Sequence, residues 1–124
     1  MPSEMRKIVF SVEELQAALV NYALRTNKKL PNTTIDSILV EGKEGVTATI
    51  IFMRDGTEEA KTVGFTQNDI AAALILYCNS QQIPLPRDAK KLVTPIEDSV
   101  GMIVKLDYSD SAPGIRPTAV TDNQ

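Results

Sequence analysis

The sequence of 124 residues contains no histidine, no tryptophan and a single cysteine. Histidine is the commonest general base near neutral pH and the commonest protein ligand of transition metals. Its absence, together with the single cysteine, excludes Cys–His and Ser–His–Asp catalytic arrangements and the usual zinc sites. The sequence therefore favours a non-enzymatic protein and indicates no catalytic residue, no metal and no cofactor.

Long apolar segments are also missing. The longest apolar run, Ile70–Cys78, is far shorter than the roughly 20 residues that a membrane-spanning helix needs. The N-terminal residues lead into only a short apolar stretch, so we expect no secretory signal. One cysteine forms no internal disulfide and suits a reducing compartment. We therefore expect a cytoplasmic protein without a membrane partner.

The chain contains an internal repeat. A shift of 55 residues superimposes identical residues, namely Phe10 on Phe65, Ala17 on Ala72, Ala18 on Ala73, Leu19 on Leu74, Tyr22 on Tyr77, Leu30 on Leu85 and Pro31 on Pro86. A one-residue slip then brings Val46, Ala48, Ile50 and Phe52 onto Val100, Met102, Val104 and Leu106. The matches predict a tandem duplication with copies at about 6–53 and 57–108. The alternative is two helices that share ordinary amphipathic spacing.

Each copy has the pattern of one strand, one helix and two further strands. Ser11 with Glu14 and Thr66 with Asp69 have the spacing of capping boxes, which satisfy free backbone N–H groups at a helix start. Apolar residues then recur at helical spacing. Strands are expected at Arg6–Phe10, Ile35–Glu41, Val46–Met53, Thr57–Phe65, Lys90–Ile96 and Val100–Tyr108, and a two-residue hairpin is expected at Asp55-Gly56.

This order predicts a single α+β domain over residues 1–108. The right-handed crossover rule places both helices on one face of a mixed sheet of about six strands. Two small sheets packed together remain the alternative. Residues 109–124 lack periodicity and are rich in turn-forming residues, which predicts a disordered C-terminal tail.

The second predicted helix is apolar nearly all the way round. A surface helix normally keeps one polar face. Ile75, Leu76 and Cys78 therefore form a candidate protein interface, most simply that of a homodimer. The alternative is that this helix lies more centrally in the fold than the first.

Basic residues follow both predicted helices. We name Arg25, Lys28 and Lys29 the first basic cluster, and Arg87, Lys90 and Lys91 the second. Together they are a candidate anion or nucleic-acid patch, although cations at helix C-termini are also expected for electrostatic reasons alone. The formal net charge of −3 disfavours general affinity for phosphate. Acidic residues at the predicted turns, including Glu41, Glu44, Glu97 and Asp98, are expected to be solvated.

These observations lead to one principal hypothesis and one main alternative, with an enzyme whose chemistry rests on carboxylates, lysine or tyrosine as a third hypothesis. The principal hypothesis is a protein-interaction module or small adaptor that binds itself and a second protein through a helix surface or a sheet edge. The alternative is a nucleic-acid-associated regulator that uses the two basic clusters.

Overall fold

The computed structural model describes residues 2–42, 45–54, 56 and 59–107, and it confirms the α+β class. Its elements are β1 (Ser3–Phe10), α1 (Val12–Arg25), β2 (Ile35–Glu41), β3 (Thr47–Phe52), β4 (Thr62–Phe65), α2 (Gln67–Ser80), β5 (Lys90–Ile96) and β6 (Ser99–Asp107). This is the predicted order. The tail at 109–124, Glu44 and Asp55 lie outside the described residues. Since β3 ends at Phe52 and β4 begins only at Thr62, the connection between them is longer than the predicted two-residue hairpin.

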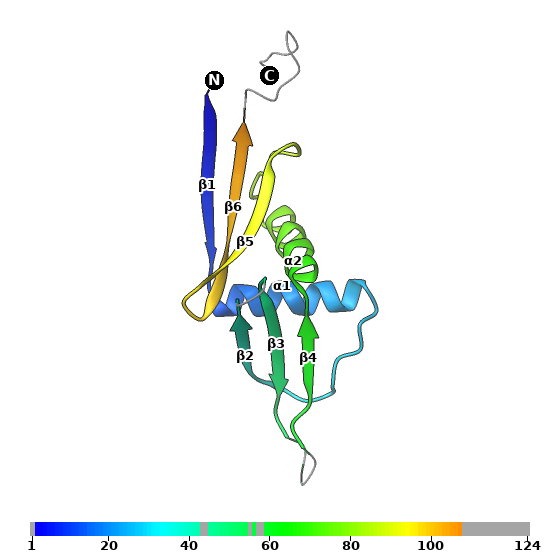
Figure 1. Ribbon diagram of the computed structural model, residues 1–124. Helices are drawn as coiled ribbons and strands as arrows, with labels where there is room; N and C mark the ends of the chain where they lie inside the picture. Colours follow the sequence, from blue (N-terminus) through cyan, green and yellow to red (C-terminus); the bar gives the residue numbers. More distant parts are fainter. Residues whose placement is uncertain (1, 43–44, 55, 57–58, 108–124) are drawn as a thin grey trace.

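The six strands form two antiparallel sheets, in the orders β1–β6–β5 and β2–β3–β4 (Figure 1). The prediction of one mixed sheet of about six strands is therefore wrong, and the alternative of two small sheets is observed. The crossover rule applies only where the strands before and after a helix share a sheet. Here α1 connects β1 to β2 in the other sheet, and α2 connects β4 to β5 in the other sheet.

Each sheet combines strands from both halves of the chain. The strand β1 of the first half pairs with β6 of the second half. The strand β4 of the second half pairs with β3 of the first half. The paired residues correspond, because Phe10 lies opposite Val100, Phe65 opposite Ala48, Val93 opposite Met102 and Ile38 opposite Ile50. The two halves thus make equivalent contacts with each other.

These registers differ from the alignment of β3 with β6 that the repeat hypothesis predicts. They make Ala48 the counterpart of Val100, an offset of 100 − 48 = 52 in place of the predicted 54. The reason is the length of the hairpin loops. Five residues separate the paired Glu41 and Thr47, whereas two residues separate Ile96 and Ser99. The difference of three residues changes the offset from 55 to 52.

Both predicted capping boxes are present. In α1, the Ser11 hydroxyl accepts a hydrogen bond from the Glu14 N–H at 3.1 Å, and the Glu14 carboxylate accepts from the Ser11 N–H at 2.8 Å. Thr66 and Asp69 make the same pair at the start of α2, at 3.2 and 3.0 Å. The sequence thus determines both helix starts through local hydrogen bonds.

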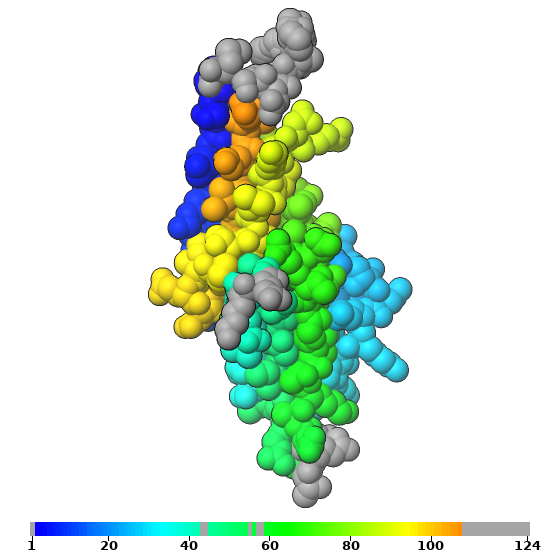
Figure 2. Space-filling view, in the orientation of Figure 1, coloured from blue at the N-terminus to red at the C-terminus, as the bar shows by residue number. Residues whose placement is uncertain are grey.

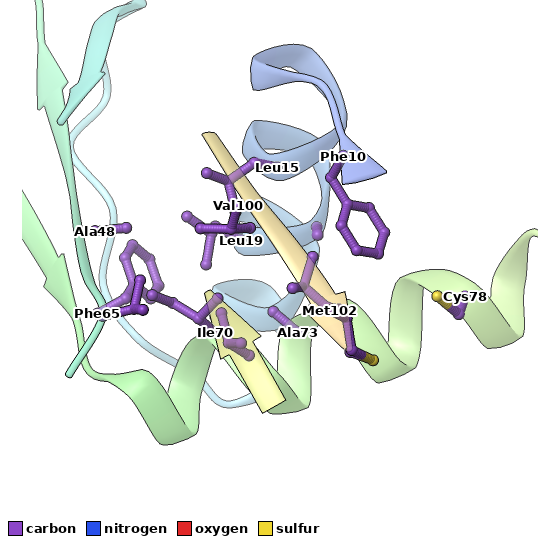
Figure 3. Close-up of a cluster of buried hydrophobic side chains, with 14 of the residues drawn as sticks. Phe10, Leu15, Leu19, Ala48, Phe65, Ile70, Ala73, Cys78, Val100 and Met102 are labelled. Atoms are coloured by element: carbon purple, nitrogen blue, oxygen red, sulfur yellow. The ribbon is translucent and has the colours of Figure 1, made fainter. Parts of the chain in front are cut away.

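One hydrophobic core joins both helices and both sheets (Figure 3). Leu15 and Leu19 of α1 meet Ile70 and Ala73 of α2, and Met102 packs with them from β6. The sheets also approach each other directly, because a Cβ placed on Gly42 would lie only 2.7 Å from Cγ of Pro95. In the part of the chain that the structure describes, no helix has the length and apolar character needed to span a membrane.

The two helices pack antiparallel, so that the end of each lies beside the start of the other. Near the end of α1, the Tyr22 hydroxyl donates a hydrogen bond of 2.8 Å to the Asp69 carboxylate in the first turn of α2. Near the end of α2, the Tyr77 ring lies edge-on to that of Phe10, which directly precedes α1, with 6.2 Å between the centroids. Both tyrosines thus contact the opposite half of the chain.

The contacts of Asp69 make a prediction about stability and pH. The pKa of its carboxyl is lowered, chiefly by the hydrogen bond from the Thr66 backbone, with smaller contributions from Tyr22, the Thr66 hydroxyl and the charge of Lys28. A lowered pKa in the folded state stabilises the protein above the ordinary carboxyl pKa, and this stabilisation is lost as the pH falls through the folded-state pKa.

We expect Asp69→Asn to lower the free energy of unfolding at pH 7 by about 1 kcal/mol, a value that allows for the partial exposure of the carboxylate. The difference from wild type should shrink as the pH falls below 4. Urea denaturation between pH 7 and pH 3 measures it. Glu59→Gln, at an exposed position between β3 and β4, is the control. A difference that stays constant with pH would show that the charge of Asp69 does not contribute.

Candidate interaction surface

The β1–β6–β5 sheet has one face against the core and one face turned away from it. Ile8, Phe10, Val93, Val100 and Met102 point inward to the core. Since successive side chains of a strand alternate between faces, the residues between them point outward. The outward residues form three rows across all three strands, which are Met5–Lys105–Lys90, Lys7–Ile103–Leu92 and Val9–Gly101–Thr94, and a further row of Ser3 and Asp107 on β1 and β6. We call this set the outer face of the β1–β6–β5 sheet.

Large apolar side chains are exposed on this outer face. Met5 is 65% exposed, Val9 57% and Leu92 51%. Ile103 lies between Lys7 and Leu92 on the central strand and is half-buried. Ile96 extends across Gly101, where its Cδ1 atom occupies the space that a Cβ would need. Met5, Val9 and Leu92 therefore lie on one surface, around the central Ile103.

Three lysines accompany these apolar residues. Lys7, Lys90 and Lys105 are all exposed and come from the three different strands. Lys90 and Lys105 are directly opposite each other in the register, an arrangement that disfavours the sheet on its own because like charges repel. An acidic group bound between them would relieve this repulsion. The outer face thus combines apolar contact area with three lysines and one carboxylate, that of Asp107, on a chain whose net charge is negative.

The three residues of the predicted α2 interface differ in how deeply they are buried. Cys78 is fully buried, Ile75 is partly buried against the core, and Leu76 is half-buried. The helix contacts α1, β3, β4 and β5, so its apolar circumference follows from a central position in the fold. Cys78 is therefore a core residue, and any contact with a partner along this helix rests on Ile75 and Leu76.

Burial also governs the chemistry of Cys78. Removal of the thiol from water raises its pKa, and the positive charge of Arg6 opposes this only in part. A thiol that stays protonated is a poor nucleophile. This agrees with a structural role for the cysteine.

The two basic clusters do not lie side by side. In the first cluster, Lys28 Nζ is 5.3 Å from the ring centroid of Phe65, where β4 leads into α2. The second cluster begins beyond the other end of α2, a helix of 14 residues and therefore about 21 Å long. Lys91 is half-buried and donates a hydrogen bond of 3.1 Å to the Ala89 carbonyl. Of the six residues, Lys90 belongs to the outer face of the β1–β6–β5 sheet.

A shallow depression of about 600 Å³ lies beside the first cluster. It is lined by Lys29, Leu30, Pro31, Asn32, Lys61, Thr62 and Val63. Two of these residues are cationic, and the remainder are neutral. No three histidine, cysteine or carboxylate side chains within the described ranges are grouped so that they could hold a metal ion.

Comparison with known proteins identifies no relative, since no family model, no curated protein and no solved structure matches the chain significantly. The surface itself is therefore the basis for inferring a function.

Sequence reasoning missed most of this surface. Met5, Lys7 and Val9 alternate with Arg6, Ile8 and Phe10, and both sets mix apolar and cationic residues. Alternation alone therefore does not show which set faces the core. The decisive information is the pairing of β1 with β6, a contact between residues nearly a hundred positions apart.

Proposed function

We propose that this protein is a non-enzymatic protein-interaction module whose outer face of the β1–β6–β5 sheet binds an acidic protein surface with apolar groups. The observation that supports this most directly is the exposure of Met5, Val9 and Leu92 beside Lys7, Lys90 and Lys105. Exposed apolar groups that adjoin one another favour contact with a partner, and lysines select a partner of opposite charge.

The composition of the outer face favours a protein partner over nucleic acid. Its described residues include no aromatic side chain, whereas proteins that bind single strands commonly stack bases on aromatic rings. Its centre is apolar, with Ile103 between Lys7 and Leu92. This pattern suits an apolar contact surrounded by ion pairs.

The arrangement of the chain also supports the inferred duplication. The halves have helices of equal length, equivalent capping boxes and corresponding strand registers. One duplication, after which the two copies exchanged one strand each, would explain all of these correspondences. In this interpretation the outer faces of the two sheets were once equivalent, and they have since diverged in charge.

The test compares variants in affinity capture from the native lysate. Leu92→Glu and Lys105→Glu are expected to reduce capture of the bound protein at least tenfold, because each opposes one part of the proposed contact. Leu39→Glu, on the outward side of β2 and 50% exposed in wild type, is the matched control on the other sheet. It should leave capture unchanged.

Nuclease treatment and salt separate the possible partners. Capture of an acidic protein should survive nuclease and weaken with rising salt. Equal capture by wild type and Leu92→Glu would contradict the proposal. Capture that disappears with nuclease would favour the nucleic-acid alternative, with the two basic clusters as the next positions to reverse.

A further inference from the structure

Three of the four sheet edges carry features that prevent pairing with another strand. The edge strand β2 is interrupted by a register shift between Ile35 and Ser37. The edge strand β4 has only four residues. The edge strand β5 contains Pro95, which lacks a backbone N–H and whose ring lies against Gly42. Bulges, short strands, prolines and charged side chains are the usual protections of a free edge.

The fourth edge, β1, is neither short nor interrupted, and its protection consists of the charges of Glu4, Arg6 and Lys7. It has eight residues without proline or glycine, and it pairs with β6 without any shift of register. Among the described elements, β6 is its neighbour in the sheet and the start of α1 packs near its end. Figures 1 and 2 show β1 at the margin of the molecule, with its other edge free of described strands. A free edge of this length is suited to strand addition.

The sequence of β1 is complementary to itself in one register. Two antiparallel copies that form one sheet must place side chains of the same face opposite each other, so the pairing is centred on a residue. Centred on Met5, the pairing places Glu4 opposite Arg6 of the second copy, and Arg6 opposite its Glu4. Met5 then meets its own counterpart, and Ser3 lies opposite Lys7.

Neighbouring registers are less favourable. Centring on Glu4, Arg6 or Lys7 places two identical charges directly opposite each other, which destabilises a strand pair. Centring on Ile8 pairs Lys7 with Val9 and Arg6 with Phe10, so that no acid meets a base. Within Glu4–Ile8, the Met5-centred register alone pairs opposite charges.

We propose that the protein forms a homodimer through antiparallel pairing of β1 with β1 of a second copy, centred on Met5. The two β1–β6–β5 sheets then become one six-stranded sheet. This also covers part of the Met5 side chain, which is 65% exposed in the single chain. The inference goes beyond the proposed function, because it concerns the edge of the sheet and holds whichever partner the outer face binds.

The first test is a charge reversal followed by sedimentation equilibrium of the full chain. Wild type is expected to be a dimer. Glu4→Arg should weaken the dimer roughly tenfold or more, since by symmetry it converts two attractive pairs into two repulsive ones. The double variant Glu4→Arg/Arg6→Glu should restore the affinity to within about threefold, because the opposite charges face each other again.

Arg6 also donates a hydrogen bond of 2.6 Å to the Pro84 carbonyl, so Arg6→Glu alone can disturb the fold. For this reason Glu4→Arg is the primary variant, and circular dichroism and thermal unfolding check each protein. Lys61→Glu, at an exposed position outside the β1–β6–β5 sheet, is the control and should leave the dimer unchanged.

Cross-linking tests the register independently. The native Cys78 is buried and does not compete for oxidation. Met5→Cys should form an intermolecular disulfide or react with a short thiol cross-linker. Val9→Cys should not, because eight residue positions, roughly 26 Å, would separate the two thiols in this register.

The outcomes are distinguishable from those of the outer-face test. A monomeric wild type, a dimer that Glu4→Arg leaves intact, or equal cross-linking at both cysteine positions would overturn the proposed edge pairing. None of these results depends on Leu92 or Lys105. Conversely, a dimer that persists in Leu92→Glu while partner capture is lost would support both proposals.

Discussion

Leu74→Ala is expected to lower the free energy of unfolding by about 3 kcal/mol, the typical cost of truncating a fully buried leucine. Leu74 is 0% exposed and lies in α2, where the helix contacts α1 and strands of both sheets. Removal of its side chain leaves a cavity that rigid neighbours on all sides fill only in part.

Leu19→Ala should have a similar effect. Leu19 of α1 aligns with Leu74 in the 55-residue shift, and it is also 0% exposed in the same core. Since one core joins both halves, each variant should unfold in a single transition. The slope of its unfolding free energy against urea concentration should equal that of wild type. Urea denaturation followed by circular dichroism measures both values.

The matched control is Leu24→Ala, at a position of α1 that is 66% exposed. It should change the stability by less than about 0.5 kcal/mol, as surface substitutions commonly do. Similar losses for Leu24→Ala and Leu74→Ala would contradict the observed packing. Two separate transitions in Leu74→Ala would show that the halves have independent cores.

Local features of the fold could be predicted from the sequence because local interactions determine them. The capping boxes at Ser11 and Thr66 fix the helix starts through side chains three residues away. The strands β2 and β5 have the predicted bounds, Ile35–Glu41 and Lys90–Ile96. The hydrophobic face of each helix follows from spacing alone, and Leu15, Leu19, Ile70 and Leu74 are buried accordingly.

The arrangement of the strands could not be predicted in this way. Nothing within residues 1–56 indicates that β1 pairs with β6 instead of with a strand of its own half. An internal repeat is compatible with two units side by side and with two units that exchange a strand. The choice depends on packing between distant segments, such as the close approach of Gly42 and Pro95.

The same limit applies to the candidate surface. The second basic cluster includes Lys90, which is on the outer face, but Lys7 and Lys105 join it only through strand pairing. The burial of Cys78, one of the three residues of the predicted α2 interface, has a related reason. An apolar helix is equally consistent with a binding surface and with a central position, and only its neighbours distinguish them.

Dividing the chain after Gly56 is expected to yield two fragments, neither of which folds as a monomer. Fragment 1–56 contains β1, α1, β2 and β3 but lacks β6 and β4, the strands that pair with β1 and β3 across the halves. Fragment 57–124 lacks β1 and β3 for the same reason. Each would retain a hairpin and one helix, and isolated hairpins and short helices are marginally stable in water.

Mixing the fragments in equal amounts should restore the native spectrum. Together they supply both pairings between the halves, β1 with β6 and β3 with β4, and they rebuild the common core. Circular dichroism and proton–nitrogen NMR spectra of each fragment, and then of the mixture, measure this. The control is the intact protein carrying a protease site in the connection between β3 and β4. Its cleaved form should remain folded, because the strand pairing between the halves, and not the connecting peptide, holds them together. A fragment that alone gives a dispersed spectrum as a monomer would show that one half needs no strand from the other.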